Sequence, residues 1–85
     1  MAQIINSDKN FKVIEVYLSD CIKWGGLGIC DYCNTAIRKG YYVAVLNSVL
    51  CEKCYKSWHH RAKNYPEDRR IEESNFNRMK SILNL

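Results

Sequence analysis

Two Cys-x-x-Cys pairs constrain this chain of 85 residues more than any other feature. Cys30 and Cys33 form the first pair, Cys51 and Cys54 form the second, and residues 34–50 separate them. Each pair can bring two thiolates to one tetrahedral metal ion, and the separating segment is long enough for a β-hairpin that returns the chain to the same point. Because sulfur would fill all four positions, none remains open for water. The spacing therefore predicts one structural Zn²⁺ held by these four cysteines.

Two other chemistries use similar ligands. Redox dithiols are typical of a βαβ pattern, which neither cysteine pair shows. A tetrahedral set of four thiolates also fits an iron–sulfur cluster, which stays the alternative to the zinc that we favour. The first ten residues hold no apolar signal-peptide core, and no apolar run approaches the roughly 20 residues that span a bilayer. We therefore expect a cytoplasmic chain without membrane contact, in which paired cysteines bind metal instead of forming disulfides.

The chain is short enough for a single domain, which we divide into three parts. Residues 1–29 are expected to form a frayed end or short edge strand, a strand over residues 11–18, a turn at Ser19-Asp20 and a glycine-rich loop over residues 24–28. Residues 30–65 would form the zinc finger. Residues 66–85 would form a C-terminal helical extension in one or two pieces, starting near Pro66.

The finger itself has a readable order of elements. A tight turn at Cys30–Cys33 (a zinc knuckle) precedes an aromatic and β-branched strand over residues 41–46. Asn47-Ser48 supplies turn chemistry, and the return strand leads into Cys51. From Cys51 to Tyr65 the apolar spacing predicts a helix with Trp58 on its core face. Knuckle, hairpin and helix in this order predict a small α+β domain of the treble-clef type.

Residues 30–55 resemble the second zinc half of a LIM domain. The shared features are the two cysteine pairs, Gly40-Tyr41-Tyr42 in the hairpin and Tyr55 directly after Cys54. A GATA-type finger is similar in its ligand spacing alone. A LIM domain has a preceding zinc half with a histidine ligand, whereas residues 1–29 contain no histidine and one cysteine. The resemblance therefore implies a single-zinc treble clef with its own additions and a role as a binding module.

The net charge of +4 arises entirely within residues 30–64. Four thiolates and one Zn²⁺ together add two negative charges, which leaves a holo chain of about +2. Basic side chains nevertheless recur along the predicted helix, where they are candidates for contact with phosphates or a partner: Lys53, Lys56, His60, Arg61 and Lys63. The alternative is a solvated helix face with cations near its C-terminal end.

Three further residues, Cys21, His59 and His60, are of types that can bind metal or act in catalysis. We expect Cys21 to be a small buried apolar side chain. His59 and His60 would lie mid-helix after a site that four cysteines already complete, so we expect surface or packing roles for them. The sequence offers neither an open metal position nor a base beside a nucleophile, and we therefore expect no enzymatic activity.

The C-terminal extension carries an imperfect apolar stripe, which includes Ile71 and the four residues Phe76, Met79, Ile82 and Leu83. This stripe either packs on the N-terminal strand or forms a homodimer or partner surface. Together with the LIM-like half, it favours a protein-interaction adaptor or regulator. The alternative function is a nucleic-acid-binding regulator that uses the basic helix face.

Overall fold

The computed structural model describes residues 2–7, 9–26 and 28–85. Met1, Asp8 and Leu27, which belong to the predicted segments 1–10 and 24–28, lie outside the described residues. The elements follow in the order β1 (Gln3–Asn6), β2 (Lys12–Tyr17), α1 (Leu18–Cys21), the 3₁₀ turn η1 (Ile22–Trp24), β3 (Lys39–Val43), β4 (Ser48–Cys51), α2 (Glu52–Arg61), the 3₁₀ turn η2 (Pro66–Asp68) and α3 (Arg69–Leu83).

The strands form one antiparallel sheet in the order β1-β2-β3-β4. Two asparagines accept the left-handed backbone of the connecting turns, Asn10 with φ of 62° and Asn47 with φ of 50°. Four consecutive residues of β2, Val13 through Val16, are buried. Because neighbouring side chains of a strand point to opposite faces, both faces of β2 are covered, and the predicted edge strand near the N-terminus is β1.

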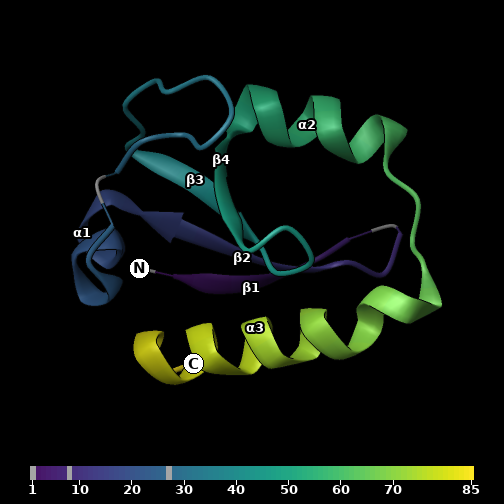
Figure 1. Ribbon diagram of the computed structural model, residues 1–85. Coiled ribbons are helices and arrows are strands. Elements are labelled where there is room, and N and C mark those ends of the chain that lie inside the picture. Colours follow the sequence, from purple (N-terminus) through teal and green to yellow (C-terminus); the bar gives the residue numbers. More distant parts are fainter. Residues whose placement is uncertain (1, 8, 27) are drawn as a thin grey trace.

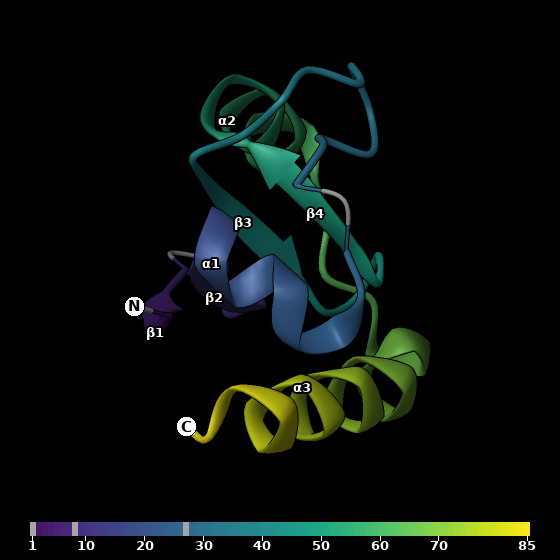
Figure 2. The ribbon, with the colours of Figure 1, turned by 90° about the vertical axis from the view of Figure 1, so that its left-hand side faces the viewer.

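The sheet lies between α2 on one face and α3 on the other, as Figures 1 and 2 both show. On the α2 face, the rings of Tyr41 and Tyr55 stack with their centroids 4.5 Å apart. On the α3 face, the Asn75 amide donates to the carbonyl of Ala44 at 2.9 Å. The structure is thus a small α+β fold in which a helix covers each side of a four-stranded sheet.

Several predicted boundaries were wrong. The segment after β2 is the short helix α1 followed by η1, where we expected a turn, because Asp20 Oδ2 accepts the Tyr17 backbone N–H (2.9 Å) and begins a helical turn. β3 ends at Val43, since residues 44–47 form the turn. The helix from the second cysteine pair ends at Arg61 and not at Tyr65. Tyr65 is 49% exposed, so it does not belong to the core face.

The C-terminal extension contains one continuous helix, α3, which η2 precedes. Phe76, Met79 and Leu83 are buried inside the chain and Ile82 packs against the same core, so the stripe packs on the sheet. Little apolar area of these four residues is therefore left for a homodimer, and dimerisation through them stays a prediction. Ile71 is 59% exposed and does not join them. Among the described residues, no helix is long and apolar enough to cross a membrane.

Candidate metal centre

The four cysteines of the two pairs lie together, with their Sγ atoms all within 4.8 Å of one another. Cys30 is buried, Cys51 and Cys54 are half-buried, and Cys33 is exposed. Sulfurs this close to one another can converge on a single metal ion, for which the Zn–S distance is about 2.3 Å. The spacing therefore predicted correctly that these four thiols meet, and the donor set fits a single metal ion.

The first pair sits in a turn that backbone hydrogen bonds hold closed. The Asn34 N–H donates to the Cys30 carbonyl (2.9 Å), and Asn34 takes the left-handed conformation that this turn requires, with φ of 60°. Asp31 ties the turn to β4: its backbone N–H donates to the Val49 carbonyl (2.9 Å), and its carboxylate accepts the Val49 N–H (2.8 Å). Sequence spacing gave no signal for this role of Asp31.

The second pair lies where β4 passes into α2. Cys51 is the N-cap residue of α2, and its Sγ accepts the Cys54 backbone N–H at 3.5 Å. Cys54 lies in the first turn of the helix, so the positive end of the helix dipole favours negative charge on both sulfurs. Because β3 and β4 pair directly, the hairpin brings this helix start back to the knuckle.

The surroundings of the four thiols give them unequal acidity. Hydrogen bonding to Thr35, whose Oγ1 lies 3.2 Å from Cys33 Sγ, lowers the pKa of Cys33 to about 6. Burial opposes ionisation of Cys30, but backbone N–H groups of Cys33, Cys51 and Tyr32 outweigh it and lower the pKa of Cys30. Burial, followed by hydrogen bonds to the other three sulfurs, raises the pKa of Cys54 to about 12. Four thiolates this close repel one another, and a divalent cation removes that penalty.

The fifth cysteine takes no part in the cluster. Cys21 is 1% exposed in the core, as predicted, and burial raises the pKa of its thiol. Neither histidine belongs to the metal-ligating group found among the described residues. His59 Nε2 lies 2.7 Å from Ser7 Oγ, and its ring packs against Phe11 and Tyr55, which agrees with a packing role. His60 is exposed.

Only part of the predicted basic stripe lies on a helix. Lys53, Lys56, His60 and Arg61 are exposed on α2, and Lys56 pairs with Glu52 at 3.3 Å. Lys63 is exposed as well, but it follows the end of α2 and so does not continue the helical spacing. The cations are therefore accessible, although they form a shorter row than predicted.

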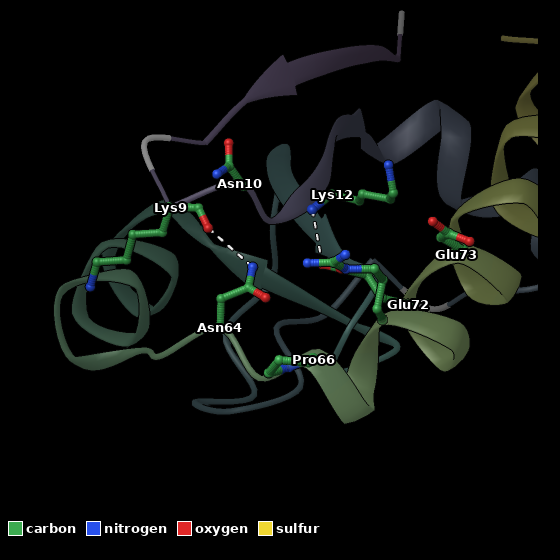
Figure 3. Close-up of a pocket in the computed structure, with 8 residues that line it drawn as sticks. Lys9, Asn10, Lys12, Asn64, Pro66, Glu72 and Glu73 are labelled. Atoms are coloured by element: carbon green, nitrogen blue, oxygen red, sulfur yellow. Dashed lines mark hydrogen bonds between the residues drawn. The ribbon is translucent and has the colours of Figure 1, made fainter.

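Lys9 binds the C-terminal end of α2, a contact that the sequence did not predict. Its Nζ donates to the carbonyls of His60 and Ala62, both at 3.0 Å, and to that of His59. These carbonyls end a helix and have no partner within it. The Asn64 side chain donates in turn to the Lys9 carbonyl (3.1 Å), as Figure 3 shows. A lysine remote in sequence carries no local signal for such a contact.

Beside this contact lies a polar cavity of about 550 Å³, which Figure 3 shows in close-up. Its most buried lining residue is Glu72, whose carboxylate accepts the Lys12 backbone N–H at 3.0 Å and so joins α3 to the start of β2. Two polar side chains that line this cavity, Lys9 and Glu72, thus hold helices on the sheet.

Comparisons with protein-family models, with curated proteins and with solved structures gave no match for this chain. The four-cysteine cluster and the surfaces around it are therefore the features that bear on function.

Proposed function

We propose that the chain is a non-enzymatic binding module in which Cys30, Cys33, Cys51 and Cys54 hold one structural Zn²⁺. The observation that carries this proposal is the meeting of four thiol sulfurs within 4.8 Å. Zinc supplies a cross-link between the knuckle and the start of α2. Four sulfur ligands would saturate the ion, so it would have no position left for substrate or water.

Within this proposal the segment from Cys30 to α2 is a treble clef like the second half of a LIM domain. The order of knuckle, β3–β4 hairpin and α2 supports this assignment, since both cysteine pairs flank the hairpin. The sheet continues beyond the hairpin into β2 and β1, and α3 closes its other face. The zinc would then fix α2 in one orientation on a sheet whose opposite face is already covered by α3.

The role that we infer for this module is that of a protein-interaction adaptor. A rigid helix held at both ends presents its outer side without an entropic cost of ordering, which favours binding. The test is isolation of complexes from a lysate with zinc-loaded protein, with and without nuclease treatment. Partners retained after nuclease treatment support the adaptor, and partners lost on nuclease treatment contradict it.

A nucleic-acid-binding regulator is the second candidate, and the exposed cations Lys53, Lys56 and Arg61 favour it. Binding through phosphates weakens steeply as salt rises, because bound cations are released from the nucleic acid. A salt titration with mixed-sequence DNA and RNA tests this candidate. The absence of binding at low salt would remove it.

A further inference from the structure

A second cavity, of about 420 Å³, lies beside the C-terminal end of α2. Its most buried lining residues are Phe11 and Trp58, which are 5% and 7% exposed, with ring centroids 4.8 Å apart. The half-buried side chains of Val45 and Leu46 come from the β3–β4 turn, and Ala62 and the exposed Tyr65 come from the segment after α2. We call this cavity, whose apolar lining these six residues form, the α2 groove.

The charge beside the α2 groove is mainly positive. Arg61 and Lys63 line the same cavity and are exposed, and Asp68 is the single acid among the lining residues. The contact between Arg61 Nη1 and Ser57 Oγ is long, at 3.5 Å. Neither Arg61 nor Lys63 forms an ion pair with an acid in residues 2–7, 9–26 or 28–85. Two cations are therefore available at the edge of an apolar recess.

We propose that the α2 groove binds a segment of a partner protein that carries one bulky apolar side chain next to acidic residues. This inference rests on the proposed adaptor function and names the chemistry of its partner. The apolar side chain enters the recess above Phe11 and Trp58, and the acidic groups pair with Arg61 and Lys63. The cavity falls within the range of roughly 300–1,000 Å³ that is usual for ligand pockets, so it has room for an aromatic or branched side chain.

The burial of the Phe11 and Trp58 rings argues against a nucleic acid as the occupant of the α2 groove. Single-stranded nucleic acids stack their bases on exposed aromatic faces. Phe11 and Trp58 are more than nine-tenths buried, so neither offers an open ring face on which a base could stack. A buried aromatic recess edged by cations instead matches the anchor pockets of protein interfaces, where one inserted side chain contributes much of the affinity.

The groove is also held in shape from both ends of α2. The four-cysteine cluster lies at the start of the helix, and Lys9 binds the carbonyls at its end, directly beside Ala62. A site that is ordered before binding loses less conformational entropy when the partner arrives. The zinc therefore acts on partner binding through the position of the helix and not through contact with the partner.

The test is selection of peptides from a random phage-displayed library on immobilised zinc-loaded protein. The proposal predicts enrichment of sequences in which Trp, Phe, Leu or Ile stands beside Asp or Glu. The selected peptide should bind the double variant R61E/K63E roughly tenfold or more weakly. The matched control is R38E, a charge reversal at an exposed residue of the loop before β3 that does not line the groove, and it should keep its affinity. A62W, which fills the recess, should also abolish binding while its thermal unfolding stays cooperative.

Three outcomes would overturn the proposal that the α2 groove binds such a segment. Peptides that bind R61E/K63E and A62W as tightly as the unaltered chain would place the partner elsewhere and leave the adaptor function standing. Failure to enrich any peptide, together with salt-sensitive binding of DNA or RNA, would reject the groove and the adaptor function together. Reversible dimerisation that A62W abolishes would show that a second copy of the chain occupies the recess.

Discussion

Replacement of Lys9 by Met removes the contact that holds the end of α2 while it keeps most of the apolar stem. In the folded protein the Lys9 ammonium donates to three carbonyls at the end of α2, of His59, His60 and Ala62. K9M leaves these carbonyls without their charged donor. The helix then loses both its hydrogen bonds and the favourable charge near the negative end of its dipole.

The magnitude follows from the geometry of this contact. A cation at a helix C-terminus contributes about 0.3–1 kcal/mol when exposed and up to about 2 kcal/mol when partly buried. Two of the Lys9 hydrogen bonds are part-buried, so we expect K9M to lower the free energy of unfolding by about 1–2 kcal/mol. For a domain of this size, that loss corresponds to a fall in Tm of very roughly 4–16 °C.

Urea unfolding of zinc-loaded protein, followed by tryptophan fluorescence, measures this change. K56M is the matched control, because the one contact of Lys56 among the described residues is an exposed pair with Glu52 on the same helix, a type of contact that contributes about 0.3–0.5 kcal/mol. Amide hydrogen exchange should also accelerate in the last turn of α2 in K9M. If K9M and K56M unfold at the same urea concentration, the lysine contact does not stabilise the helix and our reasoning about α2 is refuted.

Three further changes test other parts of the structure. W58A removes a buried aromatic ring that packs on Phe11, so it should cost about 3–5 kcal/mol of unfolding free energy in thermal or urea unfolding. E72A leaves the Lys12 N–H without its acceptor and should cost about 1–3 kcal/mol, whereas E72Q, which keeps an acceptor oxygen, should cost less in the same assay. The pKa of Cys33 is lowered from 9.0 to about 6, so its thiolate contributes stability that is complete above pH 9.0 and is lost as the pH falls through about 6. Zinc release, followed with a chromogenic chelator, should therefore begin as the pH falls through this region, and release that starts only as the pH rises would contradict the assignment.

The metal cluster could be predicted from the sequence because its signal is local. Two cysteines three residues apart already share a turn, and the residues between the pairs favour a hairpin by their aromatic and β-branched content. The second strand was readable for a similar reason, since residues 11–18 are apolar on both faces and its centre is buried on both. Burial of Cys21 followed from the ordinary behaviour of a free thiol.

The remaining features depend on contacts between distant parts of the chain. The helical spacing continued past Arg61, but the chain leaves the helix there, and Lys9 binds the carbonyls at its end. The apolar stripe of α3 gave no indication of whether it would cover the sheet or a partner, because amphipathic spacing is the same in both cases. Asp31 and Glu72 act on backbone N–H groups remote in sequence, for which no local pattern exists.

The most direct test of the account is a measurement of bound metal together with cooperative unfolding on the same sample. We expect one Zn²⁺ per chain by elemental analysis, and we expect a strong chelator to abolish the cooperative thermal transition, because binding of the ion contributes free energy to folding. C54S should lose both the zinc and the transition, whereas C21S, which alters a cysteine outside the cluster, should keep the zinc. A chain that unfolds with the same Tm before and after chelation would contradict the structural zinc site at the centre of this account.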